Sequence, residues 1–272
     1  MGVPYAEVIG DPIAQSKSPL IYGFWLAKLG MEGEYRATRV SPEALGDYVA
    51  SRRDDPDWRG CNVTMPHKES ITAFLDGVSR EAERVGAVNI VAPSSARMIG
   101  ENSDLAALRA ELLGPADTAA LLELPVVLIG AGGAARAVLE TLRAIPDVEV
   151  LILNRCLAKA ESLLSQFGLH GRALPLGSPL PATNLVVNAS SLGMTGYPEL
   201  PVSLDGVSGA LVVDLVYSPA ETNLLRQARE RSMSRTDGLS ILIGQAKEAF
   251  RRFFRVDAPF GTEPELRELL TQ

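Results

Sequence analysis

The chain has 272 residues, of which 46% are hydrophobic and 22% charged, and this composition excludes a disordered or fibrous protein. It has no run of about eighteen apolar residues, so we expect no membrane-spanning helix and no membrane partner. The formal net charge of −7 argues against a broad nucleic-acid-binding surface, and two cysteines and two histidines at scattered positions predict neither a disulfide framework nor a metal site. The first residues lack the basic and apolar regions of a signal peptide, so we expect a cytoplasmic protein.

Short apolar strands alternate with helical patterns along the chain, which predicts an α/β fold with parallel sheets. The first series of strands comprises Ala6–Ile9, Tyr35–Val40, Gly60–Val63 and Ala87–Val91, with a helix at Leu20–Leu29. After a helix at Leu105–Leu113, the second series comprises Val126–Ile129, Val148–Leu153, Asn184–Val187 and Ala210–Leu215. Helical patterns then follow at Thr222–Glu230, Leu239–Phe254 and Glu263–Leu270.

A glycine-rich turn follows the strand Val126–Ile129 and opens a helix. It consists of Gly130, Ala131, Gly132, Gly133 and Ala134, which fit the G-x-G-x-x-[GA] fingerprint of dinucleotide sites in its required context. The next strand ends in Asn154-Arg155, with Lys159 a turn later, where an NAD site usually has Asp or Glu. The missing carboxylate and the added cations favour the 2′-phosphate of NADP. The alternative is a glycine-rich turn beside a solvated Arg.

Two hydroxyls precede the first helix. Ser16 and Ser18 lie two residues apart, so on an extended segment they face the same way, and beside a helix N-terminus they form a candidate carboxylate site. Pro19 suits the first helical position, which makes Ser18 a candidate N-cap. Capping alone is the other interpretation.

Three more polar positions fit a ligand site. Lys68 follows a strand in the segment 62–68 and is a candidate general acid/base; only five of the 26 cations are Lys, and only Lys can release its proton readily. Ser103 and Asp104 lie at the junction of the two series, although they also fit a helix cap. Gln245 occupies the apolar face of its helix, as a ligand contact or as a buried structural amide.

Nine short motifs occur in order along the chain. They are Ile9–Ile13 with Ser16–Pro19, Asn62–Lys68, Gly86–Asn89, Asn102–Asp104, Gly130–Arg136, Asn154-Arg155, Asn188–Met194, Asp214–Pro219, and Asp237–Leu239 with Gln245-Ala246. In these motifs, from Val8 to about Phe250, the chain resembles the shikimate dehydrogenase family, which includes quinate/shikimate enzymes.

The resemblance implies an N-terminal α/β substrate domain (1–104) completed by C-terminal helices (239–272), a Rossmann-type NADP-binding domain (105–238), and a cleft between them. It implies reduction of 3-dehydroshikimate to shikimate with NADPH. The surface composition fits either a monomer or a homodimer. Ser16 and Ser18 would bind the substrate carboxylate, and Lys68 and Asp104 would form the catalytic pair. The residues around the substrate would be Thr64, Asn89, Ser103, Tyr217 and Gln245. Those near the nicotinamide would be Met194 and Gly238.

The chain also departs from the family pattern. Gln15 replaces a His, Tyr22-Gly23 replaces His-Asn, Ser103 replaces a Thr, Leu105–Ala107 replaces a Gly-containing stretch, and Cys156 replaces a frequent Thr. Because Gln15 and Tyr22 flank the carboxylate site, we expect that they could reshape it. One alternative is therefore a paralogue that oxidises quinate or another cyclic hydroxy-carboxylate. A non-catalytic NADP-binding sensor is another, which the presence of Lys68 and Asp104 disfavours.

Overall fold

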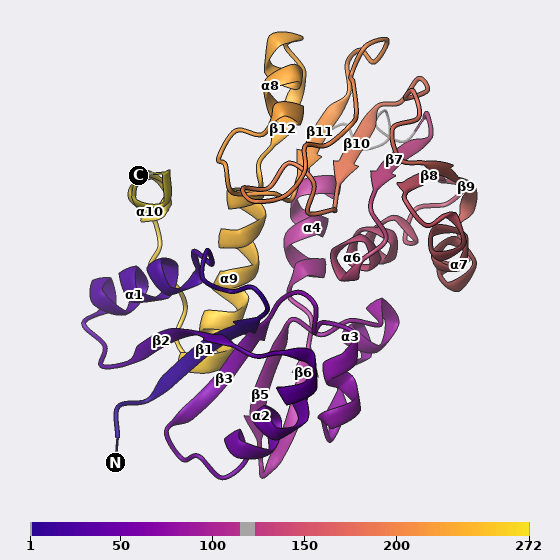
Figure 1. Ribbon diagram of the computed structural model, residues 1–272. Helices are drawn as coiled ribbons and strands as arrows, with labels where there is room; N and C mark the ends of the chain where they lie inside the picture. The colour runs from indigo at the N-terminus through magenta and orange to yellow at the C-terminus, as the bar shows by residue number, and fades with distance from the viewer. Residues whose placement is uncertain (1, 115–122, 272) are drawn as a thin grey trace. The chain divides into compact units, whose positions relative to one another are not determined.

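The computed structural model describes residues 2–114 and 123–271 and divides into two compact units (Figure 1). One unit contains residues 1–103 and 243–272, and the other contains residues 104–242. The sequence analysis places the corresponding boundaries after Asp104 and before Leu239. No helix among the described residues is both long enough and apolar enough to cross a membrane.

The first unit contains a six-stranded sheet in the order β2-β1-β3-β5-β6-β4. Its strands are β1 (Tyr5–Gly10), β2 (Glu34–Arg39), β3 (Trp58–Val63), β4 (Gly77–Val78), β5 (Ile90–Ser94) and β6 (Arg97–Glu101). The expectation of a parallel sheet is wrong here for β5, which is antiparallel to both β3 and β6. The reason is a hairpin: Ser95 and Ala96 join β5 to β6 with φ of 47° and 59°, the two positive angles of a type I′ turn.

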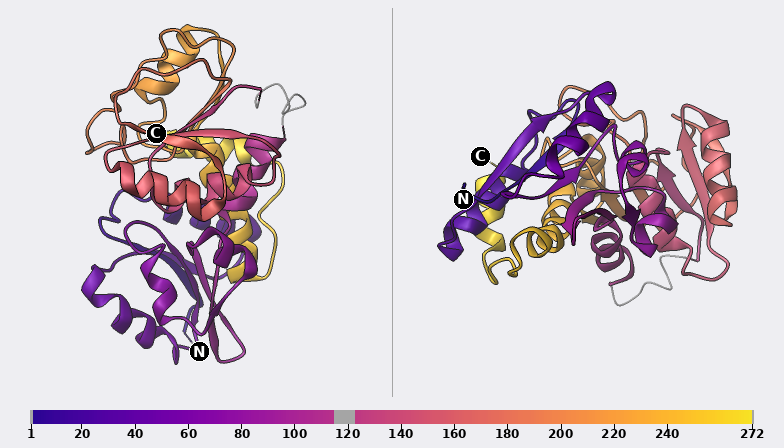
Figure 2. Two further views of the ribbon diagram at one scale, coloured as in Figure 1. Left: turned by 90° about the vertical axis from the view of Figure 1, so that its right-hand side faces the viewer. Right: turned by 90° about the horizontal axis from the view of Figure 1, so that it is seen from below.

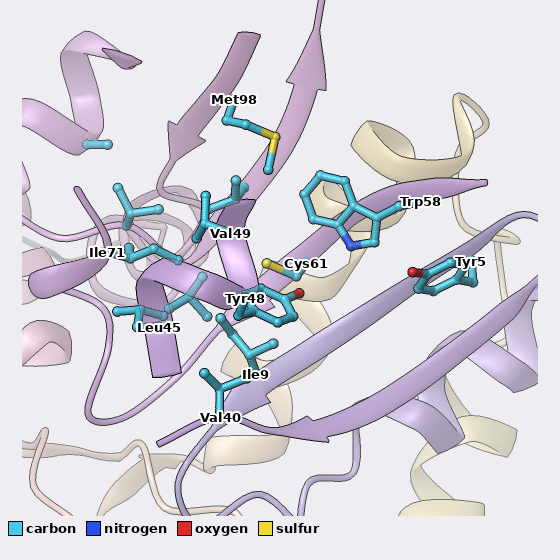
Figure 3. Close-up of a cluster of buried hydrophobic side chains, with 14 residues drawn as sticks. Tyr5, Ile9, Val40, Leu45, Tyr48, Val49, Trp58, Cys61, Ile71 and Met98 are labelled. Atoms are coloured by element: carbon cyan, nitrogen blue, oxygen red, sulfur yellow. The ribbon is translucent and has the colours of Figure 1, made fainter. Parts of the chain in front are cut away.

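Helices cover this first sheet. They are α1 (Ser18–Leu29), α2 (Leu45–Arg52), α3 (Arg80–Val85) and the part of α9 (Gly238–Phe254) from residue 243 onward, with short 3₁₀ turns at Pro42–Ala44 and Ser70–Phe74. Helix α10 (Glu263–Thr271) packs against α1. Figure 3 shows a buried cluster between the sheet and α2, in which Leu45, Tyr48 and Val49 of the helix face Ile9 and Cys61 of the strands. Burial of these apolar side chains is the main source of stability for the unit.

Among its described residues, the second unit contains six strands that are all parallel. They are β7 (Val126–Ile129), β8 (Glu149–Asn154), β9 (His170–Pro175), β10 (Leu185–Asn188), β11 (Leu211–Asp214) and β12 (Ser234–Thr236). The helices are α4 (Asp104–Leu113), α6 (Gly133–Leu142), α7 (Leu157–Phe167) and α8 (Asn223–Glu230). Helix α7 packs on β8 and β9 (Figure 2).

The strand order of the second sheet is β12-β11-β10-β7-β8-β9. Numbered within this unit and read from β9, the order is 3-2-1-4-5-6, which is that of the Rossmann fold. The strand order therefore reverses between β7 and β10, and in such sheets ligands bind beyond the carboxyl ends of the strands at that point. The α/β fold class expected from the sequence is confirmed.

Candidate functional site

One edge of the first sheet gathers most of the polar residues that the sequence analysis selects. The carboxyl ends of β1, β3 and β6 lie at this edge, and so does the amino end of β5, because β5 is antiparallel to its neighbours. The loops at this edge carry Ser16, Thr64, Lys68, Asn89 and Ser103. The topology therefore brings residues that are far apart in the sequence to one side of one unit.

The two serines at the start of α1 do not have the predicted cap geometry. Lys17 is the N-cap of α1, with φ −83° and ψ −5°, and Ser18 is the first helical residue. Ser16 accepts a hydrogen bond at Oγ from the Ser18 N–H at 3.3 Å. The assignment of Ser18 as N-cap, with Pro19 at the first helical position, is therefore wrong, since the helix begins one residue earlier. Because the backbone angles of Lys17 are right-handed and not extended, Ser16 and Ser18 are also not related by the alternation of an extended segment.

The segment after β3 holds Lys68 in a fixed loop. The Val88 N–H donates to the Lys68 carbonyl at 2.7 Å, and the His67 N–H donates to the Thr64 carbonyl at 2.9 Å. His67 is fully buried, and its Nε2 lies 2.7 Å from the Val40 carbonyl. His67 thus anchors the loop, while Thr64 and Lys68 remain half-exposed at its surface.

Asn89 is the centre of a buried hydrogen-bond network. Its Nδ2 donates to Ser103 Oγ at 3.1 Å and to Gln245 Oε1 at 2.9 Å, and its Oδ1 accepts the Ser103 N–H at 2.8 Å. Asn89 is 1% exposed and Ser103 2% exposed, whereas Gln245 is half-buried. Three residues that the sequence analysis selects separately are therefore in direct contact, and each amide orientation is fixed by the network.

A second group of buried side chains is hydrogen-bonded to the backbone of Asn89. Asn62 accepts hydrogen bonds at Oδ1 from the hydroxyls of Tyr22 at 2.8 Å and Tyr35 at 2.6 Å, and its Nδ2 donates to the Asn89 carbonyl at 3.3 Å. The rings of Tyr22 and Tyr35 stack with their centroids 3.8 Å apart. Burial raises the pKa of both tyrosines well above the ordinary value, so both hydroxyls keep their protons and act as donors.

Tyr22 is fully buried. Its side chain therefore does not contact a ligand directly, and the expectation that it reshapes the site stays a prediction, with Asn62 as the contact that connects Tyr22 to Asn89. The sequence analysis missed the roles of Tyr35 and Asn62. The signal that could have revealed Asn62 is a polar residue within the apolar strand β3, which requires a buried partner.

Asp104 is the first residue of α4 and is 6% exposed. It follows Ser103 directly in the chain but belongs to the second compact unit. A buried carboxylate in the first turn of a helix is favoured by the helix dipole.

The glycine turn of the second unit has the geometry expected for a dinucleotide site. Gly130 has φ +105°, an angle that L side chains rarely adopt, and its N–H donates to the Leu153 carbonyl at 2.9 Å. Gly132 is the N-cap of α6, and a Cβ built on it would point into open space. The open position, the N-terminus of α6 and the absence of acidic side chains in its first turn together fit a pyrophosphate.

The end of β8 lies next to this turn, because Leu153 pairs with Ile129. Asn154 uses its Nδ2 to donate to the Cys156 carbonyl at 2.8 Å, which shapes the turn into α7. Arg155 and Lys159 are exposed near the N-terminus of α7. Two exposed cations near a helix N-terminus fit the 2′-phosphate of NADP.

The loop after β10 is joined to the loop after β11. The Thr195 N–H, next to Met194, donates to the Ser218 carbonyl at 2.7 Å. Tyr217 is half-buried in the second of these loops, and burial raises its pKa. Met194 and Tyr217 are therefore held in adjacent loops at the carboxyl ends of two neighbouring strands.

Gly238 begins α9 against the backbone of the β11 loop. A Cβ on Gly238 would lie 2.5 Å from the Val216 carbonyl, so only glycine fits. Asp214, at the end of β11, fixes the same loop: it accepts hydrogen bonds from Val216 N–H at 3.0 Å, Asn188 Nδ2 at 2.9 Å and Thr222 Oγ1 at 2.6 Å. The sequence analysis assigned no role to Asp214, although an acidic residue at the end of an apolar strand indicates a structural or functional role.

Comparisons with known proteins agree with this geometry. Residues 8–91 match the family model of the shikimate dehydrogenase substrate binding domain. The chain is 50% identical to a shikimate dehydrogenase (NADP(+)) from Sphingopyxis alaskensis, over 98% of this chain and 97% of that protein.

Solved structures resemble the chain over nearly its whole length. A crystal structure of shikimate 5-dehydrogenase from Thermus thermophilus, in complex with NADP(H) and shikimate, matches with a TM-score of 0.84 and 34% identity, covering 98% of this chain and 99% of that one. A 5-ketofructose reductase of Gluconobacter sp. strain CHM43 matches with a TM-score of 0.85 and 25% identity, covering 99% of each chain. With half of its residues shared with a curated member across the full length, the chain belongs to the shikimate dehydrogenase family.

Proposed function

We propose that this protein is an NADP-dependent shikimate dehydrogenase, which reversibly reduces 3-dehydroshikimate to shikimate in the synthesis of chorismate and the aromatic amino acids. The observation that carries this proposal is the 50% identity to a shikimate dehydrogenase (NADP(+)) over 98% of the chain. The Rossmann strand order and the Gly130–Ala134 turn support the cofactor assignment.

We assign substrate binding to residues 1–104 with 239–272, and NADP binding to residues 105–238. The polar edge of the first sheet supports the first assignment, and the glycine turn supports the second. We assign the substrate carboxylate to Ser16 and Ser18, which lie next to the N-terminus of α1. Thr64 and Tyr217 complete the set around the substrate.

The hydrogen bonds of the buried network support an assignment of the groups that face the substrate. Gln245 uses Oε1 to accept from Asn89, so its Nε2 is the group that donates to a substrate hydroxyl. Ser103 Oγ accepts from Asn89 Nδ2 at 3.1 Å and donates to Asn89 Oδ1 at 3.4 Å, so its second lone pair is the group that can accept from a substrate hydroxyl. A donor on Gln245 and an acceptor on Ser103 suit the ring hydroxyls of a cyclic polyol.

When bound, NADPH supplies the hydride that reduces the C3 carbonyl. We assign its pyrophosphate to the turn that contains Gly132, its 2′-phosphate to Arg155 and Lys159, and its nicotinamide to the neighbourhood of Met194 and Gly238. Asn154 shapes the 2′-phosphate site through its bond to the backbone.

Lys68 is the proton donor in our proposal. Its ammonium group protonates the oxygen at C3 as negative charge develops there, and in the reverse direction the neutral amine accepts that proton. Asp104 orients Lys68 and the neighbouring substrate hydroxyl, which supplies position and charge stabilisation together.

The test is a set of assays that cross shikimate and quinate with NADP⁺ and NAD⁺, followed by the absorbance of the reduced nicotinamide. We expect strong turnover only with shikimate and NADP⁺. Turnover of quinate alone would overturn the substrate assignment and leave the cofactor assignment standing. Tight NADP⁺ binding without turnover of either substrate would overturn the assignment as an enzyme of this reaction.

We also propose that the protein works in the cytoplasm as a monomer or homodimer, with a small-molecule substrate and neither nucleic acid nor membrane as a partner. The net charge of −7 supports the absence of a nucleic-acid partner. Sedimentation of the purified protein distinguishes monomer from dimer.

A further inference from the structure

Helix α10 is attached to the loop that carries the two serines. The Lys17 ammonium donates a hydrogen bond to the Leu270 carbonyl, in the last turn of α10. Lys17 lies between Ser16 and Ser18 in sequence, and its backbone is the N-cap of α1. A cation bound to a carbonyl at a helix C-terminus is favoured, because the dipole places partial negative charge there.

Two further lysines attach the first half of α10. Lys28, in α1, pairs with Glu265 at 2.8 Å, and Lys247, in α9, pairs with Glu263 at 3.1 Å. All four side chains are 41–58% exposed, and exposed pairs of this kind contribute little to stability. Besides these exposed pairs, α10 is attached through its apolar face and through Lys17.

The apolar face of α10 is small. Leu266 and Leu270 are its buried residues, and the helix packs against α1, as Figures 1 and 2 show for the yellow and indigo helices. A helix of nine residues is too short to be stable in water by itself. We therefore expect α10 to be helical only while it is packed against α1, so that protection of its amides from hydrogen exchange measures this packing.

From these contacts we infer that Lys17 is a positioning residue, through which docked α10 holds the Ser16–Ser18 loop in its substrate-binding geometry. The inference rests on the proposed binding of the substrate carboxylate by Ser16 and Ser18. If docking of α10 favours substrate binding, then substrate binding must favour docking of α10 by the same factor, because coupling between two sites is reciprocal.

Hydrogen exchange of the full-length protein tests this reciprocity. We expect the backbone amides of residues 265–271, which follow Pro264, to exchange more slowly when shikimate is saturating, by about 5-fold or more. In Lys17→Met, the same segment should exchange at a rate that shikimate does not change, and the KM for shikimate should rise about 5-fold or more while kcat and the KM for NADP⁺ stay the same. Lys17→Arg, which keeps the charge and the donor, should restore both properties.

Lys28→Met is the matched control, because it removes the same charge from the α1–α10 pair at a distance from the serines. Its α10 segment should still respond to shikimate. The inference is overturned if wild-type protein binds shikimate without any change in exchange over residues 265–271. It is also overturned if Lys17→Met raises KM while α10 still responds to shikimate, because Lys17 would then act directly on the carboxylate. Absence of shikimate turnover by the wild type would instead refute the proposed function.

Discussion

Asp214 is a fully buried carboxylate whose protonation should be visible in the stability of the protein. Burial raises its pKa from 3.8 to about 6, against the hydrogen bonds from Thr222, Val216 and Asn188, which lower it. The folded state holds this proton more tightly than the unfolded chain does. The protonated Asp214 carboxyl therefore adds to the free energy of unfolding, and this contribution is fully present below about pH 4 and is lost as the pH rises through about 6.

The size of the loss follows from the shift. About 2 pKa units correspond to about 3 kcal/mol at 1.36 kcal/mol per unit, and full burial removes the need to discount for solvent screening. Asp214→Asn cannot ionise. The asparagine keeps an acceptor for the Val216 N–H but places an amide donor opposite the Thr222 hydroxyl. The changed hydrogen bond lowers the free energy of unfolding by about 1 kcal/mol at every pH.

Urea unfolding of both proteins between pH 4 and pH 7 measures the difference. The variant should be about 0.5 kcal/mol less stable than wild type at pH 4, where part of the contribution is already lost, and about 2 kcal/mol more stable at pH 7. A difference in unfolding free energy that stays constant over this range would refute the reasoning, because the Asp214 carboxylate would then titrate alike in both states.

Three other substitutions have defined outcomes. Lys68→Ala should lower kcat by about 10²–10⁴-fold with little change in the KM for NADP⁺, as steady-state kinetics would show, and unchanged turnover would exclude Lys68 as proton donor. Arg155→Ala should raise the KM for NADP⁺ by about 10- to 100-fold but leave that for NAD⁺ unchanged, since it removes a charge-assisted bond to a phosphate that NAD⁺ lacks. Tyr22→Phe should lower the unfolding free energy by about 1 kcal/mol and leave the KM for shikimate within about twofold, because Asn62 keeps its bond from Tyr35. A larger rise in that KM would place Tyr22 in the site after all.

The strands that the sequence predicts best are those of the Rossmann unit. Val126–Ile129 is found as predicted, because parallel strands buried on both faces are continuous apolar runs. The strands β9 and β12 were missed, since both are edge strands with mostly exposed, partly polar residues. The strand β6 was missed for another reason: its hairpin turn uses Ser95 and Ala96 instead of the Asn-Gly or Asp-Gly pairs that signal a type I′ turn.

The candidate site could be selected residue by residue from the sequence, but its connections could not. Asn89, Ser103 and Gln245 were each identified through their motifs, and the bonds among them depend on the mixed order of the first sheet. Tyr22 is a related case. The sequence indicates that it flanks the Ser16–Ser18 segment, but only the structure shows that its side chain is buried in the core.

The scarcity of lysine is informative only together with position. It suggested that a lysine in a site has a chemical role, yet Lys17, Lys28 and Lys247 all contact α10. The contact of Lys17 joins residues 253 positions apart, so no local pattern could predict it. What distinguishes Lys68 is its place in a fixed loop at the polar edge of the first sheet. This position supports a catalytic role for Lys68 independently of how many lysines the chain contains.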